Sequence, residues 1–436
     1  MSWVSWVSFA VCFGIVLTSI RREADYLSPA RIFGFVWSLA IGLTDLKLSR
    51  YQVEWTTESW MMLLLGIMSF LVGTLIAYVL NLGRPMVPIR TMRQVLLKEE
   101  IDESRLFWII TASVAVYGIS YIVIYLVKGF LPVFVVGTKI SRTDFYVFGF
   151  GVLINSTAFI ILFTLLYHLL VKGNKARKRF LLFITIIAVG SYFLLLQRFQ
   201  IVMAAMLCFT VLYYGTHRIR LTTVVPLVAG VTGFFYWISS LRLGSLVATY
   251  TYYSAKMKFP KAYTLFTEPY MYLAMNLENF ARAVNRLDHF TFGYFTFDFV
   301  TAAAGLKYWI SDYFNLDRTP YLISGYNTYT AFWQFYRDFG IPGLVLIPLL
   351  LGFGIGIVYY RMRSRPTIGS VTAYGVMVFV MFISYFNFPA AFLWFEYNVL
   401  AMYWIVRLIK KQPNRGAGSL MPSLSPAGGI SPGSPM

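Results

Sequence analysis

The chain has 436 residues, of which 58% are hydrophobic and only 13% are charged, and its mean hydropathy is +0.66. Soluble domains carry about a quarter charged residues. A purely water-soluble fold is therefore excluded, and lipid must solvate much of the surface. The net charge of +19 would suit nucleic-acid binding in a soluble protein. In a membrane protein it indicates basic cytoplasmic loops, so we expect no nucleic-acid partner.

Eleven apolar runs are long enough to cross a bilayer as helices. They lie at about 3–20, 31–46, 59–82, 106–127, 146–171, 180–197, 199–215, 221–240, 339–360, 367–386 and 390–409. The sixth and seventh runs form one stretch that is too long for a single span, and Gln197-Arg198 at its centre predicts a break. The sequence thus predicts an all-α polytopic membrane protein with about eleven transmembrane helices.

The basic residues of the short loops predict the orientation. Lys172 to Arg179 carries five Lys and Arg residues, which indicates a cytoplasmic loop. Alternation from this loop puts the N-terminus outside the cytoplasmic membrane and the C-terminus inside. Residues 1–411 then form one membrane-integral domain. The tail at 412–436 is rich in Pro, Gly and Ser and is predicted to be disordered.

Smaller patterns exclude several kinds of site. Cys12 and Cys208 lie in apolar runs, so they indicate neither a disulfide framework nor a metal site. Gly352, Gly354 and Gly356 lie in the middle of a predicted span and follow no strand. These glycines therefore predict close helix packing and not dinucleotide binding.

One outer loop, Leu241 to Asp338, is 98 residues long, and loops of this length are usually functional. Helical patterns occur at about Thr267–Leu287 and Phe297–Tyr313. The second has few charges and fits a helix that lies in the membrane interface, with Trp309, Tyr313 and Phe314 as headgroup anchors. Contact with sugars is the alternative for these rings.

The end of this loop carries polar residues directly into the ninth span. A helix from Thr328 would put four of them on one broad face. They are Thr330, Gln334, Arg337 and Asp338. Such a face either lines a wet cavity or pairs internally.

Four segments together carry a resemblance to a known family. They are Leu27-Ser28-Pro29 ahead of Phe33 and Trp37; Gly129 to Pro132 followed by Ser141 to Phe145; Gln197-Arg198 ahead of an apolar helix; and Asn327 to Gly343, with Asn327, Thr330, Tyr336, Asp338, Gly340 and Gly343. In this order the segments resemble the Wzy-type O-antigen and oligosaccharide repeat-unit polymerases, over most of the membrane region.

The resemblance implies a GT-C-like fold and a membrane-integral glycosyltransferase of surface-polysaccharide or lipopolysaccharide biosynthesis. The donor would be a glycan chain on undecaprenyl pyrophosphate, and the acceptor a repeat unit on the same carrier. The site would face the outside of the inner membrane and need no cofactor. Membrane lipid, a chain-length regulator and a flippase are the implied partners.

The leaving group of that reaction is a pyrophosphate, which arginine binds with two parallel hydrogen bonds. We expect Arg198 to bind it, with Arg142 and Arg242 as further catalytic cations. The alternative for Arg198 and Arg242 is an anchor on lipid phosphates. Arg282 and Arg286 are expected to contact substrate or to form an exposed ion-pair ladder with Glu278, which lies four residues before Arg282.

A base is needed for the acceptor hydroxyl. Glu278, His289 and Asp338 are the candidates, because each has a side chain that accepts protons. Arg337, Asn327, Thr330 and Tyr336 are the further candidates for substrate binding. The outer carboxylates form no close pair in the sequence, so we predict a metal-independent reaction.

Three other functions stay open. An O-antigen ligase would transfer finished chains to lipid A core, and a lipid-linked oligosaccharide flippase or another transporter would do no chemistry. A mannosyltransferase-like enzyme would carry an acidic pair in its first outer loop. Asp45, Glu54 and Glu58 in that loop are spaced too widely for such a pair.

Overall fold

A computed structural model of the chain describes residues 2–19, 24–135, 144–216, 230, 233, 247–316, 323, 326 and 328–411. Within these ranges the regular secondary structure is helical, with isolated bridges at Ser49–Met257 and Ile101–Lys410 and no strand. Four helices are long and apolar enough to cross a membrane, and three shorter ones are also apolar. These helices are those expected of a multi-pass membrane protein.

The predicted spans fall on helices, except 221–240, which lies almost wholly outside the described residues. The helices at these spans are α1 (Trp3–Ser19), α2 (Pro29–Asp45), α3 (Thr57–Val79), α5 (Glu103–Lys128), α6 (Phe150–Leu153) with α7 (Thr157–Leu170), α8 (Lys175–Phe193), α9 (Phe199–Gly215), α15 (Ala331–Ser364), α16 (Ile368–Ile383) and α17 (Leu393–Ile409). Between them lie the shorter helices α4 (Ile89–Leu96), α11 (Val247–Ser254), α12 (Thr267–Val284), α13 (Asp298–Ala303) and α14 (Lys307–Tyr313).

Local chemistry sets several helix ends. Asp102 caps α5 by accepting a hydrogen bond from the Arg105 N–H at 3.0 Å, and Gly129 ends the helix with φ +72°. The predicted break at Gln197-Arg198 is confirmed, because α8 ends at Phe193 and α9 starts at Phe199. Leu196 in this break has φ +54°, a strained value for a residue with a side chain.

Glycines bring α3 and α15 into close contact. A Cβ on Gly352 would lie 2.1 Å from the Phe70 carbonyl oxygen, and one on Gly356 would lie 2.4 Å from the Ala77 Cβ. Gly352 and Gly356 are one turn apart, as in other small-residue helix seams. The predicted close packing is confirmed for Gly352 and Gly356, whereas the Cβ position of Gly354 has nothing within 4 Å. Gly340 (φ +63°) breaks the helical geometry of α15 near its N-terminal end.

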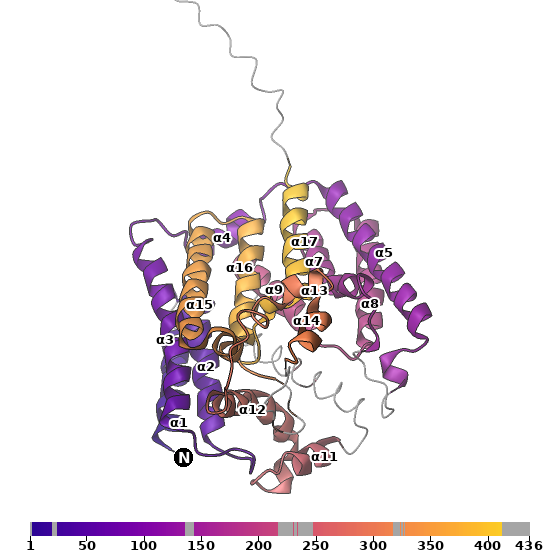
Figure 1. Cartoon of the computed structure of the whole chain (residues 1–436). Helices are drawn as coiled ribbons and strands as arrows, with labels where there is room; N and C mark the ends of the chain where they lie inside the picture. Colours follow the sequence, from indigo (N-terminus) through magenta and orange to yellow (C-terminus); the bar gives the residue numbers. More distant parts are fainter. Residues whose placement is uncertain are drawn as a thin grey trace, which may run out of the picture.

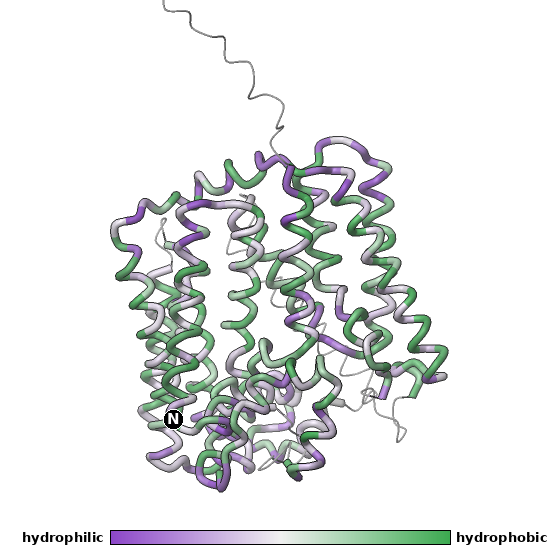
Figure 2. The backbone as a smooth tube through the Cα atoms, turned by 45° about the horizontal axis from the view of Figure 1, so that its top comes forward, coloured by the Kyte–Doolittle hydropathy of each residue, from purple (hydrophilic) through white to green (hydrophobic). Residues whose placement is uncertain are grey.

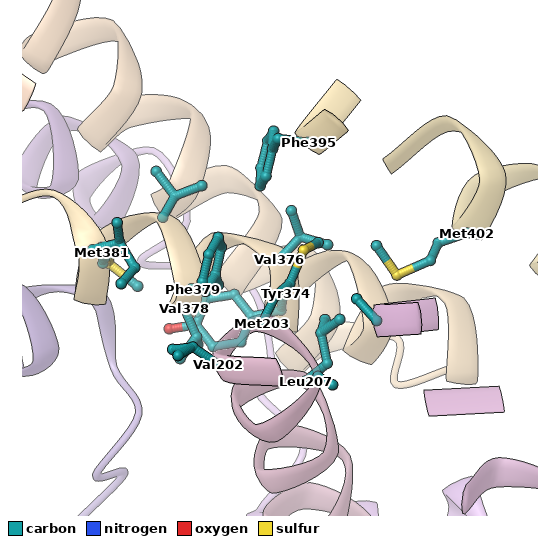
Figure 3. Close-up of a cluster of buried hydrophobic side chains, with 14 of the residues drawn as sticks. Val202, Met203, Leu207, Tyr374, Val376, Val378, Phe379, Met381, Phe395 and Met402 are labelled. Atoms are coloured by element: carbon teal, nitrogen blue, oxygen red, sulfur yellow. The ribbon is translucent and has the colours of Figure 1, made fainter. Parts of the chain in front are cut away.

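Figure 3 shows a buried cluster in which side chains from α9, α16 and α17 meet. Leu207 of α9, Phe379 of α16 and Met402 of α17 belong to it, and each is at most 2% exposed. Buried amides add polar contacts between α9, α17 and the turn at Ile154–Ser156. Asn398 of α17 donates to the Gln200 side chain of α9 at 3.3 Å, and Gln200 donates to Asn155 at 3.1 Å. Such contacts stabilise helix packing in lipid.

The helices form a bundle with two polar ends and an apolar middle (Figures 1 and 2). We call the end with α4 and the C-terminal end of α17 the tail end, and the end with α11 and α12 the loop end. Segments expected to be cytoplasmic meet at the tail end. Glu99, for example, accepts a hydrogen bond from the Ile368 N–H at 2.6 Å, and Asn174 donates to Glu103 at 3.2 Å.

The long loop differs in part from its prediction. The helix predicted at about 267–287 is confirmed as α12. The prediction of one continuous helix at Phe297–Tyr313 is wrong. Gly305 lies between α13 and α14 and has φ +73°. This left-handed residue divides the segment into two short helices. The helix expected from Thr328 starts at Ala331, because Thr330 caps it by accepting a hydrogen bond from the Trp333 N–H at 3.3 Å.

Candidate functional site

Arg198 lies at the loop end, between two apolar helices. Its guanidinium is 3.5 Å from a carboxylate oxygen of Glu268, which lies in the first turn of α12. The side chains of Arg198 and Glu268 are 14% and 17% exposed, so each is mostly covered and keeps a small exposed part. The guanidinium also lies 5.9 Å from the centre of the Tyr272 ring. We call Arg198 and Glu268 the outer pair.

Aromatic side chains continue from the outer pair along neighbouring elements. The Tyr272 ring lies 6.1 Å from Phe386, and Phe199 lies 5.6 Å from Phe386 and 6.2 Å from Trp394. We call Tyr272, Phe386, Phe199 and Trp394 the aromatic row. Tyr272 is 41% exposed and the other rings are half-buried. Ring faces of this kind bind apolar and weakly polar groups.

Glu278 anchors α12 to the segment before α3. Its carboxylate is fully buried and accepts hydrogen bonds from the Val53 N–H (3.1 Å) and the Trp55 indole N–H (2.9 Å). Arg282 donates to the same group at 3.4 Å and also to the Tyr51 carbonyl oxygen. The expected pairing of Glu278 with Arg282 is confirmed. The alternative of an exposed ion-pair ladder is wrong, because tertiary contacts cover the Glu278 carboxylate.

Tyr270 adds a second anchor on the same side of α12. Burial raises the pKa of its phenol to about 12, so the group keeps its proton near neutral pH. The hydroxyl donates to the Gln52 side chain at 2.7 Å and accepts from the Leu48 N–H at 3.0 Å. The N-terminal part of α12 is thereby held firmly against the α2–α3 connection.

Asp338 and Arg337 are used internally. Asp338 is fully buried and accepts hydrogen bonds from the Thr291 hydroxyl, the Phe295 N–H (3.3 Å) and the Thr296 N–H (2.6 Å). Arg337 is 2% exposed, and its guanidinium lies 3.9 Å from the centre of the Phe295 ring. The two residues therefore fix the loop at 291–296 on α15, which agrees with the internal-pairing alternative.

The other described candidates lie apart from the outer pair's contacts. His289 is exposed and lies 2.6 Å from Asp288; hydrogen bonds from the Asp288 backbone N–H and from His289 lower the pKa of that carboxyl. Arg286 is exposed in the turn just after α12, and Tyr336 is half-buried on α15. Thr330 serves as the helix cap described above.

Three further candidates, Arg142, Arg242 and Asn327, lie outside the described residues. Sequence reasoning missed Glu268 and Tyr272, although they lie four residues apart at the start of a predicted helix. That spacing places both on one helix face and was the available signal. No group of three His, Cys, Asp or Glu side chains that could hold a metal occurs within the described ranges.

A more deeply buried ion pair, also missed, lies at the tail end. Asp25 accepts hydrogen bonds from the Leu27 N–H (3.1 Å), the Tyr214 hydroxyl (2.9 Å), the Tyr359 hydroxyl (2.9 Å) and the Arg363 guanidinium (2.7 Å). We call Asp25 and Arg363 the inner pair. Arg363 also donates to the Val87 carbonyl oxygen at 3.1 Å, so the pair joins four separate segments of the chain.

The geometry of the outer pair suits a ligand in which an anionic group is attached to one or more rings. A guanidinium that is held by a carboxylate and keeps an exposed part can bind phosphate oxygens. The aromatic row can stack against rings attached to the phosphate. The inner pair is enclosed by its own hydrogen bonds and suits a structural role. No protein-family model, no curated protein and no solved structure matches this chain.

Proposed function

We propose that this protein is a lipid-linked oligosaccharide repeat-unit polymerase, a membrane-integral glycosyltransferase of about eleven spans with a GT-C-like fold. It transfers a glycan chain from polyprenyl pyrophosphate to a hydroxyl of another lipid-linked repeat unit. The observation that carries the proposal is the partly exposed Arg198–Glu268 pair, 3.5 Å apart, at a helix break beside the aromatic row.

In the reaction, the bond between the anomeric carbon and the pyrophosphate oxygen breaks, and the acceptor oxygen bonds to that carbon. Negative charge grows on the departing pyrophosphate. Arg198 stabilises this charge through its planar fork, and an arginine that is already oriented loses little entropy in doing so. Glu268 supplies the orientation, since its carboxylate lies beside the guanidinium.

The acceptor hydroxyl gives up its proton as the new bond forms. Glu278 and Asp338 are occupied by internal hydrogen bonds, and His289 lies apart from the outer pair. Water therefore takes up the proton, and no side chain is assigned as the base. Sugar rings adjoining the anomeric carbon stack on the aromatic row. Trp and Tyr present large, rigid faces to such rings.

The proposed orientation puts the loop end outside the cytoplasmic membrane. The basic short loops meet at the tail end, and such loops favour the cytoplasmic side. A thiol introduced by Tyr263→Cys, at an exposed site of the loop end, should react with an impermeant reagent in intact spheroplasts. Labelling only after lysis would contradict this orientation.

The activity is tested with purified protein in liposomes and a synthetic undecaprenyl-pyrophosphate-linked repeat unit. We expect a ladder of products from the unaltered protein and none from Arg198→Ala. Arg105→Ala is the matched control, because Arg105 is an exposed arginine with an acidic partner at the tail end. Full-length products from Arg198→Ala would refute the assigned site.

Two further outcomes separate the rival functions. Products that form only when lipid A core is added would indicate a ligase. In cells that lack the gene, single repeats on the surface lipid are expected for a polymerase. Complete absence of repeats there would indicate a flippase instead.

A further inference from the structure

A surface of exposed aromatic side chains covers α14 and the residue directly after it, at the loop end. Tyr308, Trp309, Tyr313 and Phe314 are 66%, 62%, 71% and 62% exposed. The Trp309 and Tyr313 rings stack at 5.5 Å, and Tyr313 meets Phe314 edge-on at 5.0 Å. We call these four residues the aromatic platform. So many large rings rarely face water together on a soluble surface.

The platform has a fixed shape. Tyr294 donates a hydrogen bond to the Lys307 carbonyl oxygen at 2.8 Å, and the Leu306 N–H donates to the Thr301 carbonyl oxygen at 2.9 Å. Ser311 is buried on the opposite side of α14. The helix is therefore amphipathic: it is held on the protein through one face and presents its rings on the other.

The charge at the start of α14 is compensated. The Lys307 ammonium lies 2.6 Å from a carboxylate oxygen of Asp298, and the two side chains are 29% and 10% exposed. Pairing lowers the cost of moving a charge out of water. Asp312 is the exposed charged residue of α14, and a headgroup layer is polar enough to hold it.

The platform adjoins surfaces that must face lipid. In Figure 1, α13 and α14 lie beside the loop-end part of α17, and α13 packs against α17. Tyr403 and Trp404, farther along α17 toward the tail end, are also exposed. The turn at Gly305 lies close to Phe148, because a Cβ on Gly305 would be 3.7 Å from the Phe148 ring. Phe148 lies just before α6 and is 73% exposed.

We propose that the aromatic platform is seated in the headgroup–acyl boundary of a phospholipid bilayer, as a built-in membrane anchor of the long loop. Trp and Tyr are enriched at this depth, because their rings are apolar and their N–H and O–H groups are polar. The occupant of the surface is lipid, and neither a second protein nor a soluble sugar covers it. The inference is independent of the catalytic proposal.

Spin labels measure the depth directly. The chain has only two cysteines, Cys12 and Cys208, so a background with both replaced by alanine allows selective labelling. Trp309→Cys and Tyr313→Cys are labelled separately in liposomes of phosphatidylethanolamine and phosphatidylglycerol. Relaxation by oxygen and by a water-soluble nickel chelate is then compared.

Tyr263→Cys is the matched control, because Tyr263 is an exposed ring (55%) of the same loop. We expect the oxygen-to-nickel ratio at 309 and 313 to exceed that at 263 by about fivefold, since the chelate is excluded from the apolar zone. Equal ratios would overturn the proposal and leave the platform in water. Dipolar broadening between labels on different copies would overturn it too, by showing a protein contact.

Discussion

The inner pair and the outer pair are both ion pairs at the ends of apolar helices, but their surroundings differ. Asp25 receives four hydrogen bonds of 3.1 Å or less, and the two side chains of the inner pair are at most 10% exposed. Arg198 and Glu268 are 3.5 Å apart and more accessible. A pair enclosed by several hydrogen bonds of its own stabilises the fold, whereas a somewhat more exposed pair beside ring faces suits a ligand. Two of the three predictions below test this difference, and the other tests the helix seam.

The largest effect is expected at the inner pair. Asp25→Ala leaves Arg363 buried without its carboxylate, which costs about 3–5 kcal/mol. We expect a large loss of thermal stability in detergent and little protein in membranes. Replacing both residues, as in Asp25→Asn with Arg363→Met, should recover part of the loss. A normal unfolding midpoint for Asp25→Ala would show that this pair does not hold the tail end together.

A smaller loss is expected at the helix seam that joins the two ends. Gly352→Ala brings a Cβ against the Phe70 carbonyl oxygen, and overpacking of this kind costs about 1–3 kcal/mol. Gly354 is the control two residues away, with nothing within 4 Å of its Cβ position. The thermal midpoint should fall for Gly352→Ala and stay unchanged for Gly354→Ala. Equal midpoints would mean that the seam tolerates the added atom.

The smallest change in stability, with a specific change in activity, is expected at the outer pair. Glu268→Gln keeps the side-chain shape but removes the charge that orients Arg198. The polymerisation kcat should fall about tenfold, because misplaced groups lose transition-state stabilisation. The thermal midpoint should not move. Glu100→Gln, in an exposed ion pair with Lys411 at the tail end, serves as the control. A matching fall in both activity and midpoint would assign Glu268 a structural role.

Several features followed from local patterns. Apolar runs predicted the helices, because a bilayer requires stretches of about 20 apolar residues. Gln197-Arg198 predicted the break between α8 and α9, and the glycines at 352 and 356 predicted a close seam. The division at Gly305 was missed, since a helical period persists on both sides of a left-handed residue.

The sequence by itself determined which segments are helical and where isolated charges interrupt apolar stretches, because both depend on neighbours along the chain. Only the tertiary structure decided the partners of those charges. Asp25 and Arg363 are 338 positions apart, and Arg198 meets Glu268 through the folding of the long loop. A charge at a helix end can be satisfied by many groups of similar chemistry. The packing of distant helices selects one of them, and no local pattern records that choice.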